Sequence, residues 1–173
     1  VNIFDCDVTA VNISRDEIEV GKELAKKHCK TPDKIKWVCA DSPDNIEGQF
    51  DVVFAGEFLE HVPEPQKIID ALEKRCKNGG QMIFTVPLGP WGDVPEYGEQ
   101  RGHLWNFEKQ DISDMFGNKK KLSVKTVSGS MNEYDKELLG WYVISYITSN
   151  AATGEIDIKR KINIQVPRGT LST

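Results

Sequence analysis

Apolar strand-like runs alternate with helix-like segments along this chain, and this alternation restricts its fold more than any other feature. Residues 50–55 (FDVVFA) form an almost continuously apolar run, which is typical of a strand buried on both faces. Residues from Pro65 onward have helical spacing up to the break at 78–80 (NGG), and residues 81–86 (QMIFTV) have the composition of another strand. Strands separated by helices predict a parallel sheet with helices on its faces.

The first 40 residues repeat this order. A β-rich run covers residues 8–13, and Ser14 follows at a position suited to a helix N-cap, with Glu17 three residues later. The spacing predicts a helix from there to His28. A second strand is expected over residues 35–39.

The order changes after residue 87. A loop rich in glycine, proline and aromatic residues leads to a short predicted helix at 108–116. Two strand-like runs, 122–127 and 141–148, then follow without a convincing helix between them, so we expect an antiparallel hairpin at one edge of the sheet. Trp37 and Trp141 lie within predicted strands, and we expect both in the core.

Together these segments predict an α/β fold: a Rossmann-like, doubly wound, mostly parallel sheet with an antiparallel edge hairpin. The chain has 173 residues, the size of one ordinary domain. We assign residues 1–149 to that domain. Residues 150–173 read as an extra edge strand or as a linker to a further domain.

Composition excludes several classes of function. The net charge of -5 argues against a dedicated nucleic-acid binder, and no apolar run is long enough for a membrane helix. The cysteines are scattered without metal-ligand spacing, which favours buried, reduced thiols in a cytoplasmic protein and predicts no metal site. Small molecules, sugars and proteins remain as partners, and a homo-oligomer is compatible with an exposed sheet edge.

Ligands of an open parallel sheet bind beyond the carboxyl ends of its strands. Asn12 stands at such an end, and its amide could hydrogen-bond sugar hydroxyl groups. Asp41 stands at the next strand end and could accept a hydrogen bond from an exocyclic amine. Ile13 would supply an apolar wall for a base. This edge of the sheet is therefore expected to hold a nucleoside.

Three segments, in order and at the expected spacing, carry a resemblance to a known family. They are VTAVNISRDEIEVGKELA, CADSPDNI and FDVVFAGEFLEHVPEPQKIIDALEKRCKNGGQMIFTVP. This order resembles the class I S-adenosylmethionine-dependent methyltransferases that act on small molecules. RGHLWNFEKQDISDMF resembles the family's later segment, in which a helix covers the acceptor pocket.

The resemblance implies S-adenosylmethionine as the cofactor and assigns a role to each matching position. Asn12 stands where the family usually has an acidic residue that binds both ribose hydroxyls. Asp41 matches the residue that binds the adenine amino group, with Ala40 and Ser42 on either side. The loop near the methionine end of the cofactor corresponds to Ala55, Gly56 and Glu57.

The family's first strand and its glycine-rich loop are expected before the strand that ends at Asn12. Only residues 1–7 precede Val8, and none of them is glycine. Such a loop brings the backbone close to the amino-acid part of the cofactor. We therefore expect an N-terminally incomplete domain, a fragment of a longer protein rather than a degenerate member, that binds the cofactor weakly or not at all.

His103 and His61 are the candidate catalytic residues. His103 lies in the loop that the family uses to shape acceptor pockets, and an imidazole there suits proton removal at neutral pH. The alternative for His103 is a loop imidazole bonded to backbone. Glu60 and His61 open the helix after the strand 50–55, where a helix-start carboxylate and a packed imidazole are the structural alternative.

The sequence thus predicts a methyltransferase domain that acts on a small-molecule or saccharide acceptor. The alternative is a degenerate, non-catalytic domain that serves as a scaffold or interaction module in a longer polypeptide. A different nucleotide-binding α/β enzyme is a weaker third reading, because neither a GxGxxG nor a P-loop pattern occurs.

Overall fold

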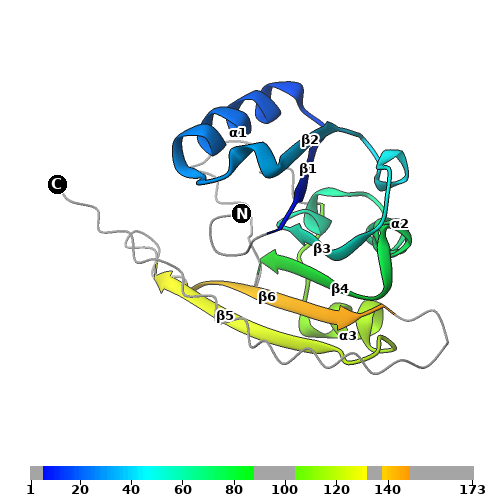
Figure 1. The fold of residues 1–173 in the computed structure, drawn as a ribbon. Coiled ribbons are helices and arrows are strands. Elements are labelled where there is room, and N and C mark those ends of the chain that lie inside the picture. Colours follow the sequence, from blue (N-terminus) through cyan, green and yellow to red (C-terminus); the bar gives the residue numbers. More distant parts are fainter. Residues whose placement is uncertain (1–5, 88–103, 132–137, 149–173) are drawn as a thin grey trace.

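A computed structural model describes residues 6–87, 104–131 and 138–148. The strands of this part of the chain form two sheets, one two-stranded and one four-stranded, and three α-helices pack beside them (Figure 1). The tail assigned to residues 150–173 lies outside the described residues, so its prediction as a strand or linker stays untested.

The first unit contains β1 (Val8–Asn12), α1 (Arg15–His28) and β2 (Ile35–Cys39), with β1 and β2 paired in parallel. Ser14 caps α1 as predicted, because its hydroxyl oxygen accepts a hydrogen bond from the Glu17 amide at 3.3 Å. The ring of Trp37 fits against Gly21 of α1, where an added Cβ would lie 2.6 Å from the ring. This close approach explains a glycine in the middle of a helix, where it otherwise lowers stability.

The second sheet has the strand order β3–β4–β6–β5. The parallel pair is β3 (Phe50–Gly56) with β4 (Cys76–Pro87), while β6 (Leu138–Ile147) runs antiparallel to both β4 and β5 (Ser123–Met131). The antiparallel hairpin at the sheet edge is confirmed, as is the α/β class. The sheet is divided, however, since no ladder joins β1 or β2 to β3 among the described residues.

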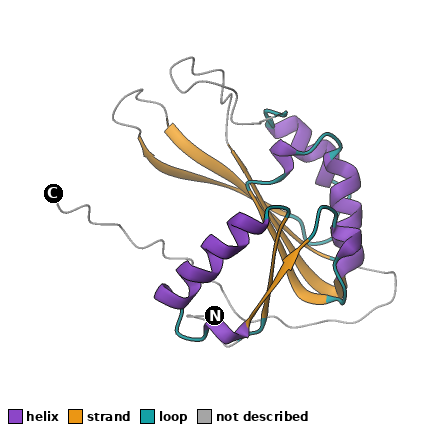
Figure 2. Ribbon diagram, turned by 90° about the horizontal axis from the view of Figure 1, so that it is seen from above, coloured by secondary structure: helices purple, strands orange, loops and turns teal. Residues whose placement is uncertain are grey.

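Two helices cover one face of the four-stranded sheet. Figure 2 shows α2 (Pro65–Arg75) and α3 (Lys109–Phe116) on one side of it and α1 on the other. The largest fully buried side chains between the two helices and the sheet are Leu59, Ile69, Met82, Phe84, Ile112, Phe116, Ile144 and Tyr146. On the opposite face of β3, Val52 and Phe54 are 52% and 65% exposed. No described helix is long and apolar enough to cross a membrane.

The end of α2 differs from the prediction. The helix stops at Arg75, and residues 78–80 lie within β4 instead of ending the helix. Gly79 has a φ of 78°, and the β3–β4 register shifts between the pairs that involve Phe50 and Val52. Gly79 therefore accommodates the bulge in a left-handed conformation that favours glycine. Gly80 is needed for space, because an added Cβ would lie 2.8 Å from the carbonyl oxygen of Asp51.

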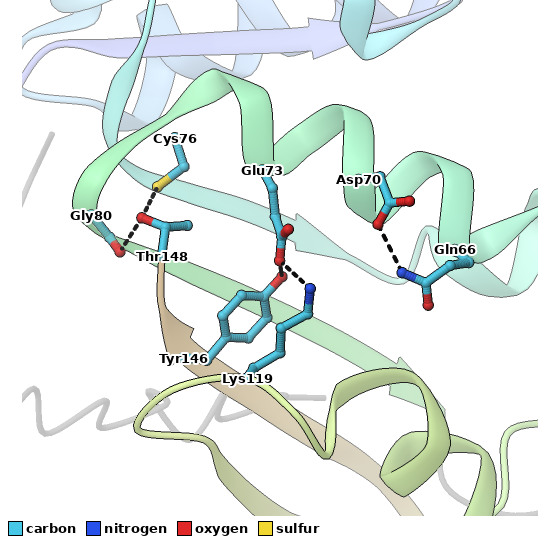
Figure 3. Close-up of polar contacts among 8 residues, drawn as sticks. All are labelled: Gln66, Asp70, Glu73, Cys76, Gly80, Lys119, Tyr146 and Thr148. Carbon is cyan, nitrogen blue, oxygen red and sulfur yellow. Dashed lines mark hydrogen bonds and ion pairs between the residues drawn. The ribbon is translucent and has the colours of Figure 1, made fainter. Parts of the chain in front are cut away.

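A hydrogen-bonded cluster fastens α2 to β6 and to the turn after α3 (Figure 3). Tyr146 donates its hydroxyl hydrogen to Glu73 Oε1 at 2.6 Å, and Lys119 Nζ forms an ion pair with the same oxygen at 2.7 Å. The Tyr146 ring also stacks on Phe84, with the centroids 6.2 Å apart. Burial raises the pKa of Tyr146, and the bond to Glu73 raises it further, so the phenol remains a donor at neutral pH.

Replacing Tyr146 with Phe should lower the free energy of unfolding by about 1–2 kcal/mol, because a hydrogen bond to a charged group is lost from a largely buried site. Urea unfolding monitored by circular dichroism would measure the change. Tyr142→Phe is the matched control, since Tyr142 is on the same strand and no hydrogen bond of its hydroxyl is found among the described residues. Equal losses in the two variants would contradict a special role for the Glu73 contact.

Candidate functional site

The carboxyl ends of β1 and β2 bring the first group of predicted residues together. The Ala40 amide donates to the carbonyl oxygen of Asn12 at 3.1 Å, so the two strand ends are joined. Asn12 Oδ1 accepts a hydrogen bond from the Ser14 amide at 2.8 Å. This bond holds the Asn12 side chain against the start of α1, so a ligand hydroxyl would meet its NH₂ donors.

Asp41 and Ile13 complete this first group. Asp41 Oδ1 accepts from Asn45 Nδ2 at 2.8 Å, while the Ser42 hydroxyl oxygen caps the following 3-10 helix, Pro43–Asn45 (η2). Ile13 is 70% exposed, although its carbonyl oxygen is held by the Cys39 thiol at 3.4 Å. An exposed aliphatic side chain near a fixed carboxylate has the chemistry that an adenine ring needs.

The end of β3 carries the second group. Ala55 is buried in the core, and Glu57 adopts a φ of 50°, in the left-handed region that is uncommon for residues other than glycine. The Glu57 amide donates to the carbonyl oxygen of Thr85 at 3.0 Å. Strained backbone of this kind often marks a functional site.

The Glu57 carboxylate connects three strands. Oε1 accepts from the Thr85 hydroxyl at 2.8 Å, and Oε2 accepts from Trp141 Nε1 at 3.0 Å. The prediction that Trp37 and Trp141 lie in the core is wrong, because both are only half-buried and neither belongs to the core cluster. The indole N–H of Trp141 instead holds a carboxylate at the carboxyl end of β3. Gly56 is closely enclosed in the same region: an added Cβ would lie 2.5 Å from the Phe54 ring and 3.1 Å from Thr85 Oγ1.

Glu60 and His61 lie just beyond this strand end, in a 3-10 helix (Leu59–His61, η3) that precedes α2. The prediction that they open the following helix is therefore wrong in detail. Phe58 and Val62 bound this short helix in non-helical conformations, and α2 starts only at Pro65, where a proline is favoured.

Glu60 is the residue that sequence reasoning undervalued. It is only 1% exposed, and among the described residues neither carboxyl oxygen has a hydrogen-bond partner. Burial is the largest effect and raises the pKa of Glu60, whereas the residue's own backbone amide lowers it; the smaller effects of the Glu57 and His61 charges raise and lower it, respectively. His61 Nε2 lies 3.9 Å from Glu60 Oε1, and the His61 side chain is 38% exposed. The available signal was a glutamate within the apolar stretch FLEHV.

The segment after the loop passes directly over η3. The amides of Leu104 and Trp105 donate to the carbonyl oxygen of Glu60 at 2.7 and 3.3 Å, and Trp105 Nε1 donates to the carbonyl oxygen of Val62 at 2.7 Å. Trp105 thus anchors the start of the segment that leads to α3. His103 lies outside the described residues, so its predicted role stays a prediction.

The predicted residues therefore form two groups, one at the ends of β1 and β2 and one at the end of β3. The hydrogen bonds reported above lie within each group, and the groups belong to different sheets. The first group offers an amide, a carboxylate and an aliphatic wall. The second contains the Glu57 carboxylate and the Thr85 hydroxyl, which bond each other, and the partly exposed His61 imidazole, whereas the Glu60 carboxyl group is buried.

Comparisons with known proteins identify similar sequences and folds. Residues 2–84 match the family model described as a methyltransferase domain. The chain is 30% identical over 80 residues to a ubiquinone biosynthesis O-methyltransferase from Erwinia tasmaniensis, and 33% identical over 80 residues to one from Pectobacterium atrosepticum. Each match covers 46% of this chain, which spans about a third of the length of these relatives.

Solved structures resemble a larger part of the chain. Phosphoethanolamine N-methyltransferase 2 from Haemonchus contortus, in complex with S-adenosyl-L-methionine, has a TM-score of 0.62 at 16% identity and covers 84% of this chain and 44% of its own. Magnesium protoporphyrin IX methyltransferase from Synechocystis, with bound SAH, has a TM-score of 0.59 at 16% identity, covering 82% and 63%. The fold is therefore shared with these methyltransferases, and residues 2–84 of the chain are similar to a methyltransferase domain.

Proposed function

We propose that this chain forms part of an enzyme that transfers a methyl group from S-adenosylmethionine to a hydroxyl group of a small molecule. The observation that carries the proposal is the first group, in which the Ala40 amide joins the strand end of β1 to that of β2 beside Asp41. This juxtaposition follows the residue order of the family and offers the polar and apolar contacts that an adenosine requires.

Each half of the cofactor has a fitting counterpart among the described residues. We assign Asn12 to the ribose hydroxyls, Asp41 to the adenine amino group and Ile13 to the face of the ring, with Ala40 and Ser42 as neighbours. Ala55, Gly56 and Glu57 are assigned to the methionine end. Two of the structural neighbours are complexes with S-adenosylmethionine or SAH, which supports this cofactor.

The acceptor is proposed from the second group and from the relatives. The matched curated proteins are named O-methyltransferases of ubiquinone biosynthesis, which supports a small molecule with a hydroxyl group over a saccharide. The prediction of buried thiols is wrong for most of the cysteines, since only Cys76 is buried, whereas Cys6 and Cys39 are exposed and Cys29 is half-buried. All four are free thiols, which supports a reducing, cytoplasmic location. The protein's own residues would position the acceptor and receive its proton, since in-line geometry supplies most of the acceleration.

When bound, S-adenosylmethionine supplies the activated methyl group. Thr85 and Trp141 hold the Glu57 carboxylate in place before any ligand arrives, so no side chain needs to be reorganised there. His61 is the proposed proton acceptor at this end. His103 keeps the same assignment as a proposal from its sequence position alone.

A non-catalytic scaffold is the second candidate, and one observation favours it. β1 and β3 each lack a strand partner on one edge among the described residues, and Val52 and Phe54 expose apolar surface on β3. A divided sheet weakens any site that needs both strand ends at a fixed distance. One structural neighbour is a [4+2]-cyclase, with a TM-score of 0.59 at 12% identity, so the fold alone does not prove methyl transfer.

Replacing Asp41 with Ala should remove binding of S-adenosylmethionine, because the adenine amino group loses its acceptor. Isothermal calorimetry on the 173-residue chain would measure the dissociation constants of the wild type and the variant. We expect the loss of Asp41 to weaken binding by at least tenfold. Asp33→Ala, an exposed aspartate at the other end of β2, is the control. Absence of binding in every form would refute the proposal.

Replacing Asn12 with Asp should tighten binding by about tenfold, because a carboxylate forms charge-assisted hydrogen bonds with both ribose hydroxyls. The carboxylate also keeps the acceptor that the Ser14 amide uses now. Asn118→Asp, which adds the same charge in the turn after α3, should leave affinity unchanged. Equal effects of the two changes would mean that net charge, rather than a ribose contact, is responsible.

A further inference from the structure

The two sheets are joined by no strand ladder among the described residues, so other contacts fix the first group of candidate residues relative to the second. The connection from β2 to β3 contains η2 (Pro43–Asn45), and η2 packs against α2. No other pair of described elements from the two sides makes as extensive a contact. The place of the Asp41 end of the site relative to β3 therefore depends on how η2 is held against α2.

Arg75, the last residue of α2, holds this contact through its guanidinium group. Nη1 donates a hydrogen bond to the carbonyl oxygen of Ile46, directly after η2, at 2.9 Å in a partly buried position. Ile46 is only 8% exposed, and Pro43 at the start of η2 is buried as well. A hydrogen bond from a charged donor is stronger than one between neutral groups. Arg75 therefore ties the connection between the two sheets to the end of α2.

A short chain of hydrogen bonds leads from this contact to Asp41. The Ile46 amide donates to the carbonyl oxygen of Pro43 at 3.2 Å, and the Asn45 amide donates to that of Ser42 at 3.1 Å. Asn45 Nδ2 then donates to Asp41 Oδ1 at 2.8 Å. A displacement of Ile46 would thus displace η2 and, with it, the side chain that holds the Asp41 carboxylate.

The guanidinium group has a feature that a purely structural link does not require. Arg75 Nε is buried and has no hydrogen-bond partner among the described residues, which is unfavourable. A helix end that needed only a positive charge could use an exposed lysine, as Lys74 does in the same turn. The structure therefore retains an unfavourable polar atom at the point where the arginine reaches Ile46.

We infer that Arg75 is a positioning residue for the cofactor: through Ile46 and η2 it holds the Asp41 carboxylate where the adenine amino group binds. This inference rests on the proposed function. Arg75 has no contact of its own with the cofactor and acts only through η2 and Asn45. Such preorganisation strengthens binding, because the loop does not have to be ordered when the ligand arrives.

The local part of this inference can be tested without cofactor. In Arg75→Met an apolar side chain of similar length replaces the donor, so η2 should open more often. Amide hydrogen exchange measured by NMR on the 173-residue chain should be about threefold faster or more for Asn45 and Ile46, and unchanged for Phe84 in the core of β4. Unchanged exchange in η2, or equal acceleration at Phe84, would overturn the inference.

Calorimetry with S-adenosylmethionine on the same chain tests the connection to the site. Arg75→Met should weaken binding by about tenfold, and Arg75→Lys, which keeps a charged donor, should recover part of the loss. Lys74→Met is the matched control, since it removes an exposed charge from the same turn of α2 and should leave the affinity unchanged. Unchanged affinity in Arg75→Met, or an equal loss in the control, would overturn the inference.

A double-mutant cycle separates positioning from a general loss of stability. Asn45→Ala removes the last bond of the chain that leads to Asp41, so in the Arg75→Met background it should weaken binding much less than in the wild type. Additive losses would overturn the inference. Absence of binding by the wild type would count instead against the proposed function, while the exchange rates of η2 would still show whether Arg75 holds it.

Discussion

The parallel pairing of β3 with β4 is the interaction on which the rest of this structure depends. It requires a crossover connection, and α2 provides one that buries Ile69 and Leu72 against the sheet. β6 then pairs with the free edge of β4, and Tyr146 connects that strand back to α2 through Glu73. At the carboxyl end, the same three strands meet at the Glu57 carboxylate. Core, hairpin and candidate site are thus consequences of one pair of strands.

The bulge in β4 allows α2 to lead directly into the strand that pairs with β3. The helix ends only where the strand begins, at Cys76, and Gly79 lets the backbone turn through a conformation that a side chain would oppose. Thr148 extends the link by donating its hydroxyl hydrogen to the carbonyl oxygen of Lys77 at 2.6 Å. The glycines near the bulge therefore serve the packing of α2 on the sheet rather than a flexible loop.

Much of the fold could be predicted from the sequence because its signals are local. Apolar runs, the Ser14 cap and the close spacing of the last two strands each report on a few neighbouring residues, and all were confirmed. The division of the sheet could not be predicted in the same way, because strand order depends on contacts between residues far apart in the chain. The glycines at 79 and 80 led to the wrong prediction of a helix end, because a helix end and a strand bulge both use the conformational freedom of glycine.

The residues of the candidate site also differ in whether local sequence signals reveal them. Residues at strand ends, such as Asn12 and Asp41, can be found from sequence because a parallel sheet places its strand ends together. The contacts of Trp141 and Glu60 could not be assigned from the sequence, because Trp141 bonds a residue 84 positions away and Glu60 is notable for the hydrogen-bond partners that it lacks among the described residues. A fold selected for stability alone would replace such a carboxyl group with an apolar side chain of similar size. A buried glutamate directly after β3 therefore favours a functional rather than a structural reason for the residues at this strand end.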